Sequence, residues 1–177
     1  RGHGRSEGER VWVGRFEEYV ADTGFFLDFL AQQYGVRLDR VLLFGHSMGG
    51  AVACWYALEK PEGLQALILS SPCFALELWV PFAEKLIGFG SRLFPRAVIN
   101  NPVPPVLLTH DPEEARAYTT DPLIQRRITW KLTAEMLRAG EIVRSRARSI
   151  HIPLYMIVAG KDRIVKTKAA RHFFNQA

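Results

Sequence analysis

The sequence has little cysteine and no long apolar run. The first shortage argues against a cysteine-based metal site, and the second argues against a membrane-spanning helix. Only Cys54 and Cys73 occur among its 177 residues, and two cysteines at that spacing form no metal-ligand signature. We interpret both as buried thiols in a reducing compartment. Every apolar stretch is interrupted by Pro, Gly or a charge well before it reaches the length of a membrane span. No signal-peptide pattern is visible at the N-terminus.

The sequence also lacks the patterns of a nucleic-acid-binding protein. It has no zinc-finger spacing, no aromatic-basic sheet motif and no basic tail. The formal charge is +5, and the basic residues are scattered, apart from the pair Arg126-Arg127 and the trio Arg144, Arg146 and Arg148. We interpret them as a solvated face, with weak attraction to anionic lipid headgroups as the functional alternative.

The length allows one sizeable core and is too short for two full domains. The first residue is Arg1 rather than Met, and the chain opens inside the turn-rich stretch RGHGRSEG. We therefore expect the sequence to be an internal fragment of a longer protein.

Strand and helix patterns alternate along much of the chain. Helical spacing of apolar residues predicts a helix at 16–34 that stops at Gly35, another at 48–60 that ends before Pro61, and a third at 166–176. Short apolar runs predict buried strands at 40–45, 64–72 and 152–160. This alternation indicates an α/β protein with a mostly parallel sheet and helices on both of its faces.

The interval from 73 to 150 breaks this alternation. It holds an apolar helix pattern at 76–94, a proline cluster at 101–105 and a further helix pattern at 126–140. We interpret it as a helical cap inserted over the C-terminal edge of the sheet. The expected division is therefore a core part at 1–72, the cap at 73–150 and a second core part at 151–177.

The stretch VLLFGHSMGG, residues 41–50, suggests the chemistry. A strand that ends in Gly-x-Ser-x-Gly and leads into a helix is the pattern of a nucleophile elbow. We expect a Cβ at Gly45 or Gly49 to clash in the tight turn, and Ser47 to hold a strained backbone conformation. Ser47 is then the candidate nucleophile, and the Met48 N–H, at the start of the helix, is the candidate oxyanion donor.

The motifs GHSMGG, RGHGRS and AGKDRIV, together with LTHDPEEARAYTTDPLIQRRIT at 108–129, resemble the α/β-hydrolases of the monoacylglycerol lipase, lysophospholipase and serine-aminopeptidase-like group. The resemblance covers essentially the whole chain. It implies an α/β-hydrolase fold with a helical cap, present here as a partial domain truncated at both ends. It also implies a serine hydrolase that needs no metal or organic cofactor.

The resemblance implies the triad order Ser, Asp or Glu, then His. Asp162, in the turn GKDRIV after a strand, is the expected triad acid, and a helix N-cap or turn aspartate is the alternative. Asp121 is the second candidate, but the Asp-Pro pair there is typical of a turn. The second oxyanion donor is expected N-terminal to RGHG.

No histidine of this chain suits the role of the base. His46 adjoins the nucleophile, and His3 lies in the RGHG turn. His110 belongs to the cap, His151 precedes a strand, and His172 lies in the last helix. We expect the base after one more strand, beyond Ala177, so that the isolated chain is nearly inert.

The cap pattern suggests a lipid-like ester substrate. Apolar residues recur at helical spacing along the cap helix: Trp79, Phe82, Ala83, Leu86 and Ile87. We expect Trp79, Phe82 and Leu86 to contact a fatty acyl chain, with possible contact to a membrane surface. The same face could instead pack on the core.

Three functions compete at this point. The first is a carboxyl-ester hydrolase that acts on monoacylglycerol or lysophospholipid through an acyl-enzyme on Ser47. The second is a serine aminopeptidase, in which acidic cap residues would hold a substrate amine; the candidates are Glu77, Glu84, Glu113, Glu114 and Glu135. The third is a catalytically inactive binding fragment.

Overall fold

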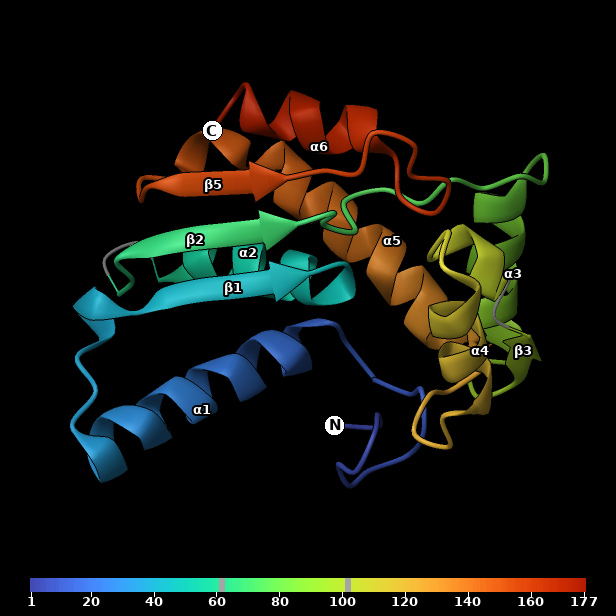
Figure 1. Cartoon of the computed structure of the whole chain (residues 1–177), viewed down its shortest axis with the longest axis horizontal. Coiled ribbons are helices and arrows are strands. Elements are labelled where there is room, and N and C mark those ends of the chain that lie inside the picture. The colour runs from blue at the N-terminus through green and yellow to red at the C-terminus, as the bar shows by residue number, and fades with distance from the viewer. Residues whose placement is uncertain (61–62, 101–102) are drawn as a thin grey trace. The chain divides into compact units, whose positions relative to one another are not determined.

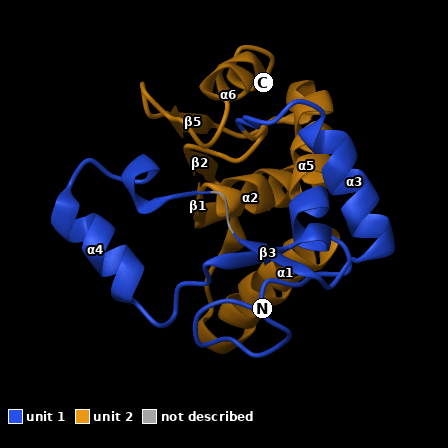
Figure 2. Cartoon of the chain, turned by 90° about the vertical axis from the view of Figure 1, so that its right-hand side faces the viewer, with its two compact units in different colours: residues 1–15, 77–135 blue, residues 16–76, 136–177 orange. Residues whose placement is uncertain are grey.

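The computed structural model describes residues 1–60, 63–100 and 103–177. These residues form two compact units, coloured separately in Figure 2. Residues 1–15 and 77–135 make the first unit, and residues 16–76 and 136–177 make the second. The division predicted from the sequence, with boundaries after residues 72 and 150, stays a prediction.

The second unit contains a parallel sheet of three strands (Figure 1). The strands are β1 (Leu42–His46), β2 (Ala66–Ser70) and β5 (Leu154–Ile157), in the spatial order β1-β2-β5. All three lie where apolar runs predicted them, and β2 and β5 are shorter than expected. The predicted mostly parallel sheet of an α/β fold is confirmed.

The two faces of this sheet differ in burial because successive side chains of a strand point to opposite faces. Leu67 and Leu69 are fully buried, and Gly45 on the same face lies against helix α2 (Met48–Glu59). The register places four exposed apolar side chains together on the other face: Leu42, Phe44, Tyr155 and Ile157. Among the described residues, this second face of the sheet is left open, so the prediction of helices on both faces is met on one face only.

Helices surround the buried face of the sheet. Helix α1 (Glu17–Tyr34) ends at Gly35, as predicted, because Gly35 adopts the left-handed conformation (φ 64°) and caps the helix. Helix α2 ends at Glu59, while Pro61, the expected stop signal, lies outside the described residues. Helix α6 (Thr167–Phe174) follows β5. Short 3₁₀ turns at Leu38–Arg40 and Ala147–Ser149 precede β1 and β5.

Aromatic rings fill the core of this unit. Phe16 stacks on Trp55 with ring centroids 5.9 Å apart, and Phe74 lies 4.6 Å from Phe173. All four side chains are buried. The contacts join residues far apart in the chain, so this core links the first and last parts of the unit.

In the first unit, the cap helix is shorter than its sequence pattern predicted. Helix α3 spans Ala83–Leu93, whereas the apolar spacing predicted a helix over 76–94. Pro81 explains the late start, because the residue before a proline is pushed out of the helical region. Phe82 then adopts a left-handed conformation (φ 60°), so the chain turns there and the helix begins at Ala83.

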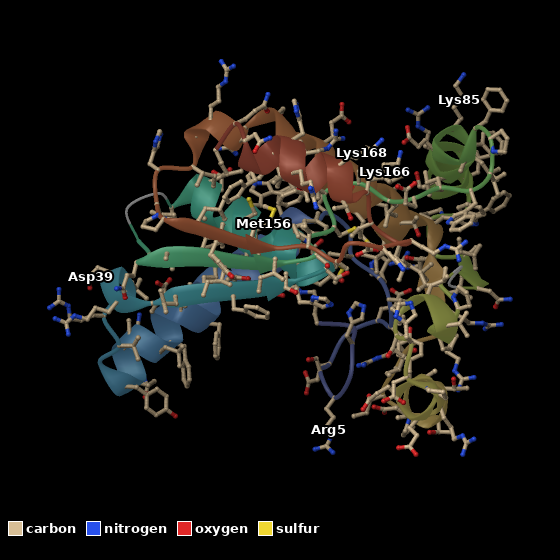
Figure 3. The ribbon with its side chains drawn as sticks, turned by 45° about the horizontal axis from the view of Figure 1, so that its top comes forward. Arg5, Asp39, Lys85, Met156, Lys166 and Lys168 are labelled. Atoms are coloured by element: carbon tan, nitrogen blue, oxygen red, sulfur yellow. The ribbon has the colours of Figure 1, made fainter. Side chains whose placement is uncertain are left out.

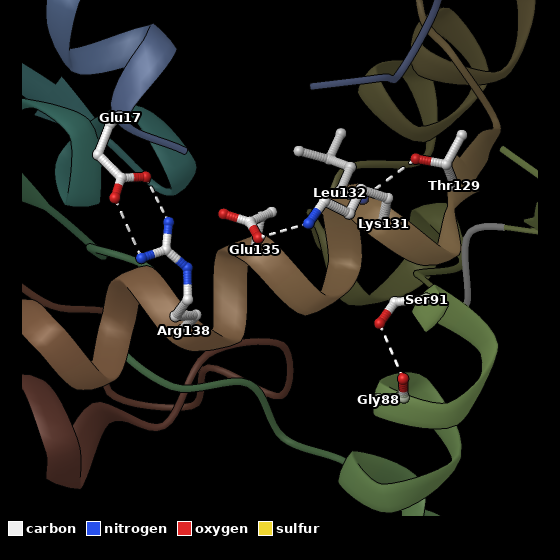
Figure 4. Close-up of polar contacts among 8 residues, drawn as sticks. All are labelled: Glu17, Gly88, Ser91, Thr129, Lys131, Leu132, Glu135 and Arg138. Atoms are coloured by element: carbon white, nitrogen blue, oxygen red, sulfur yellow. Dashed lines mark hydrogen bonds and ion pairs between the residues drawn. The ribbon is translucent and has the colours of Figure 1, made fainter. Parts of the chain in front are cut away.

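The prediction of a helix over 126–140 was wrong at its start. Strand β4 (Arg127–Thr129) pairs antiparallel with β3 (Val98–Asn100), and helix α5 runs from Trp130 to Ser145. Thr129 begins the helix: its Oγ1 accepts a hydrogen bond from the Leu132 N–H at 3.1 Å (Figure 4) and donates one to the Val11 carbonyl at 2.7 Å.

Two further elements complete the first unit. Helix α4 (Pro112–Thr120), which the sequence patterns did not predict, begins at Asp111, whose carboxylate accepts a 2.8 Å bond from the Glu113 N–H. A 3₁₀ turn at Pro105–Leu107 begins at the last proline of the proline cluster. Residues 101 and 102 of that cluster lie outside the described residues.

Candidate active site

Ser47 lies at the turn between β1 and α2 in a strained backbone conformation (φ 52°, ψ −121°). This was predicted from Gly-x-Ser-x-Gly. The Ser47 N–H donates to the Ser70 carbonyl at 3.0 Å, and the Ser47 carbonyl accepts from the Cys73 N–H at 2.9 Å. Since both backbone groups are engaged by residues that end β2 or follow it, the surrounding chain holds the strained turn in place.

The glycines around Ser47 differ in whether a Cβ would fit at their position. A Cβ on Gly45 would lie 2.4 Å from the Gly49 carbonyl oxygen, and a Cβ on Gly50 would lie 2.8 Å from the Cβ of Pro72. A Cβ on Gly49 would meet nothing within 4 Å. The expectation of a clash at Gly49 was therefore wrong: Gly45 and Gly50 allow the close approach of strand, helix and following loop.

The start of α2 offers donors for negative charge. Met48 is the first residue of the helix, so its N–H has no helical carbonyl four residues earlier to pair with. The aligned peptide dipoles add partial positive charge at this end. The Ser47 side chain beside it is partly exposed. The turn therefore combines a partly exposed serine with an N–H suited to an oxyanion.

Asp162 lies in the loop between β5 and α6, at the same edge of the sheet, since β1 and β5 both run parallel to β2. Its Oδ1 accepts hydrogen bonds from the Ile164 N–H (2.9 Å) and the Val165 N–H (3.0 Å). These bonds shape the turn, as the alternative interpretation of Asp162 anticipated. With one oxygen so occupied, the other oxygen of the carboxylate remains for a second partner.

Cys73 connects the serine turn with the aspartate loop. Its N–H bonds the Ser47 carbonyl, and burial, with a smaller effect of the Asp162 charge, raises the pKa of its thiol to about 12. The residues that follow Cys73 contact the loop that carries Asp162, through Ala75 and Leu76.

The residues after Cys73 extend the same connection. The Lys166 N–H donates to the Ala75 carbonyl at 2.8 Å, and Leu76 forms an antiparallel bridge with Val165. The segment that follows β2 therefore fixes the aspartate loop on one side and the serine turn on the other. Sequence reasoning missed this role. The available signal was Ser-Ser-Pro, a break in extended structure immediately after a buried strand.

Three of the five histidines belong to the same unit as Ser47. His46 Nδ1 lies 3.1 Å from Ser70 Oγ on the neighbouring strand, so its ring is engaged there. His151 precedes β5 and lies at the opposite edge of the sheet, and the exposed His172 lies in α6. His3 and His110 belong to the other unit.

The apolar side chains of the predicted cap face divide into two groups. Trp79, Phe82 and Leu86 are 64%, 76% and 54% exposed, whereas Ile87 is buried. Lys85, labelled in Figure 3, holds its Nζ 5.6 Å from the centre of the Phe82 ring. Helix α3 therefore buries one apolar face and presents another to solvent.

Gly90 marks the buried side of α3. A Cβ there would lie 2.6 Å from the Trp130 ring, so the helix is packed closely on that ring within its own unit. The exposed face can contact a ligand without unpacking this side.

A cavity of about 370 Å³ lies among α4 and its neighbouring loops in the first unit. Polar and apolar side chains both line it: the polar ones are Thr109, Glu114, Tyr118 and Asp121, and the apolar ones are Leu108, Ala117 and Ile124. Asp121 accepts a 2.8 Å hydrogen bond from the Leu123 N–H, as expected of a turn aspartate. Sequence reasoning did not foresee this cavity.

Two kinds of feature were not found in the part of the chain that the structure describes. No set of three or more His, Cys, Asp or Glu side chains is grouped as metal ligands would be. No helix there combines the length and apolar character needed to cross a bilayer.

Comparison with known proteins gives consistent matches along the whole chain. Residues 1–177 match the family described as serine aminopeptidase, S33. The chain is 31% identical to the monoacylglycerol lipase of Mycolicibacterium smegmatis, over 97% of this chain and 61% of that protein. It is 30% identical to the human monoglyceride lipase, over 96% of this chain and 56% of that protein.

A solved structure agrees with these sequence matches. The crystal structure of a monoacylglycerol lipase from Paleococcus ferrophilus superposes with a TM-score of 0.85 at 29% identity, over 99% of this chain and 65% of that one. The chain therefore spans about 60% of the length of these relatives.

Proposed function

The chain belongs to the serine aminopeptidase S33 family of α/β-hydrolases, and from this premise we propose that it is part of a serine carboxyl-ester hydrolase. The proposed substrates are esters like monoacylglycerol or lysophospholipid. Two of the matched relatives are named for monoacylglycerol or monoglyceride, which supports this substrate class.

The geometry of Ser47 supports the proposal most strongly. A non-glycine residue at φ 52° costs free energy, and the chain retains it between a buried strand and a helix start. Such a turn presents the hydroxyl at the sheet edge where active sites of α/β proteins form. Because Val11, Ser71 and Phe82 also hold positive φ, the support comes from the place of Ser47 between β1 and α2 rather than from strain alone.

In the proposed mechanism, Ser47 Oγ attacks the ester carbonyl and loses its proton to a general base. The Met48 N–H stabilises the oxyanion of the tetrahedral intermediate. Collapse of that intermediate breaks the bond to the alcohol, which leaves with the proton from the base and gives an acyl-enzyme on Ser47. Water then repeats the sequence and releases the fatty acid. Asp162 orients the base and stabilises its protonated form.

The base and the second oxyanion donor are the open parts of this mechanism. We propose that the base is a histidine supplied from outside these 177 residues, because His46, His151 and His172 are poorly located for the task. The limited coverage of the relatives is compatible with this.

Hydrolysis of monoolein by the longest natural protein that contains these residues tests the function. Ser47→Ala should lower kcat by about four orders of magnitude or more, and Asp162→Asn by a similar factor. The 177-residue chain alone should release no burst of p-nitrophenol from p-nitrophenyl butyrate. Robust turnover by the chain alone would refute the external base, and an active Ser47→Ala variant would refute the nucleophile.

The exposed face of α3 supports a lipid-like substrate. Trp79, Phe82 and Leu86 are proposed to contact the acyl chain, or the membrane surface from which it comes. Replacement of Phe82 and Leu86 by Ser should raise KM for monoolein much more than for a short-chain ester. An equal change for both esters would remove these residues from substrate binding.

A serine aminopeptidase is the second candidate function, and the cavity at α4 favours it. Glu114 and Asp121 could together hold a substrate ammonium group. Glu135, by contrast, is buried and paired with Lys131 at 3.0 Å. Hydrolysis of an aminoacyl-naphthylamide that Glu114→Gln abolishes, together with no hydrolysis of monoolein by the parent protein, would select this function over the lipase.

A further inference from the structure

Positive charge is concentrated in one part of the second unit. Its residues 16–76 contain three Lys or Arg against seven Asp or Glu, while residues 136–177 contain nine against two. The basic residues are thus less scattered than the whole sequence suggested. Five exposed side chains of the β5–α6 loop and α6 form what we call the basic rim: Lys161, Arg163, Lys166, Lys168 and Arg171.

The basic rim is mounted on an anchored loop at the edge of the sheet that carries Ser47. The Lys166 N–H is bonded to the Ala75 carbonyl (2.8 Å), and Thr167 Oγ1 donates to the Ala159 carbonyl (3.2 Å). Figure 3 shows Lys166 and Lys168 together at the start of α6. Because the loop is fixed at both ends, these lysines are held in place beside the candidate site.

Stability does not explain where these lysines are. Lys166 and Lys168 lie at the N-terminus of α6, and the first turn of that helix contains no acidic residue. Cations at this end face the positive pole of the helix dipole, which is unfavourable. The same arrangement strengthens the positive potential at this edge, as a surface that attracts anions requires.

The character of the basic rim fits an anionic lipid surface better than a nucleic acid. Residues 161–172, KDRIVKTKAARH, contain no Phe, Tyr or Trp on which bases could stack. Three of the five cations are lysines, which act as point charges and need no bidentate partner. Clusters of four to eight such cations attract membranes that contain anionic lipids.

We propose that the basic rim docks the protein on an anionic bilayer, with the edge that carries Ser47 directed toward the lipid. This inference rests on the proposed lipid-ester function, because docking serves an enzyme whose substrate lies in a membrane. It concerns a different surface from the apolar face of α3. Docking by the basic rim raises the local concentration of the active site at the membrane that contains the substrate.

Vesicle co-sedimentation of the 177-residue chain tests the proposal. The chain should bind vesicles of phosphatidylcholine mixed with phosphatidylglycerol and should bind pure phosphatidylcholine much more weakly. Replacement of Lys161, Lys166 and Lys168 by Gln should weaken binding to the anionic vesicles roughly 100-fold at low salt. Binding should also fall as the ionic strength rises toward about 1 M, where the screening length is about 3 Å.

A matched control removes the same charge from the opposite edge of the sheet. Arg40 precedes β1, Lys60 follows α2, and Arg148 precedes β5; all three are exposed. The triple variant Arg40→Gln, Lys60→Gln, Arg148→Gln should bind anionic vesicles almost as well as the parent chain. Circular dichroism of both triple variants verifies that they are folded.

Several results would overturn the proposal. These are equal loss of binding in the two triple variants, equal binding of the parent chain to both kinds of vesicle, and binding of a single-stranded oligonucleotide without binding of vesicles. The assay involves no hydrolysis. If the longest natural protein that contains these residues binds the vesicles but fails to cleave monoolein, the proposed function is refuted and the docking surface stands.

Discussion

The glycines around Ser47 give a prediction in which neighbouring substitutions have opposite signs. A Cβ at Gly45 would lie 2.4 Å from the Gly49 carbonyl oxygen and 2.8 Å from both Gly50 Cα and Ala53 Cβ. Carbon atoms prefer separations of about 3.5–4.0 Å, and backbone cannot move aside as a flexible side chain can. We expect Gly45→Ala to cost about 3 kcal/mol of unfolding free energy, the upper part of the range for overpacking.

Gly49→Ala is the matched control. It adds the same methyl group four residues along the chain, where no atom lies within 4 Å. Gly49 is already helical, and Ala is the better helix former by up to about 1 kcal/mol. This variant should therefore be as stable as the parent chain or slightly more stable.

Urea denaturation followed by circular dichroism measures both changes. For a chain of this size, about 3 kcal/mol corresponds to a fall in Tm of roughly 6–12 °C, which a thermal scan resolves easily. The reasoning is refuted if Gly45→Ala is as stable as the parent, or if Gly49→Ala is destabilised as much as Gly45→Ala.

Three further predictions concern other parts of the chain. Thr129→Val should cost about 2 kcal/mol in urea denaturation, because it removes a helix cap and leaves a buried carbonyl unpaired, whereas Thr120→Val, at an exposed site, should cost under about 0.5 kcal/mol. Burial raises the pKa of the Cys73 thiol from an ordinary 9.0 to about 12. The contribution of this thiol to the free energy of unfolding should therefore be constant below about pH 9 and decline as the pH rises toward 12. A thiol reagent at pH 8 should label Cys73 only after denaturation, and rapid labelling of the native chain would contradict this. The partly exposed ion pair of Glu17 with Arg138 (Figure 4) should give a coupling free energy of about 1 kcal/mol or less in a double-mutant cycle, smaller still in high salt.

The sequence was most informative where local chemistry decides the structure. The stop at Gly35 follows from its left-handed conformation, and the strained Ser47 follows from a strand that runs directly into a helix. The three strands of the parallel sheet were predicted from their apolar runs, but the expected burial holds mainly for β2, with Leu67 and Leu69 fully buried. Such features depend on residues within a few positions of one another.

Features that depend on distant residues were missed. Strands β3 and β4 have three residues each and pair across nearly thirty residues of chain, so neither shows a periodic pattern of its own. The segment after β2 bonds the serine turn through Cys73 and the aspartate loop through Ala75 and Leu76, and it reaches both only after β2 and β5 pair. Gly49 was misjudged for the same reason, because only the packed positions of Pro72 and α2 decide which glycine is crowded.

The open face of the three-stranded sheet has a consequence for handling the protein. Phe44 and Tyr155 flank Ile68 in the register, and the first two are more than half exposed, so the strands present a continuous apolar strip to water. Surfaces of this kind promote self-association. Purified at high concentration, this chain should scatter light and elute early in gel filtration, and Phe44→Lys should suppress both effects while the serine turn keeps its shape.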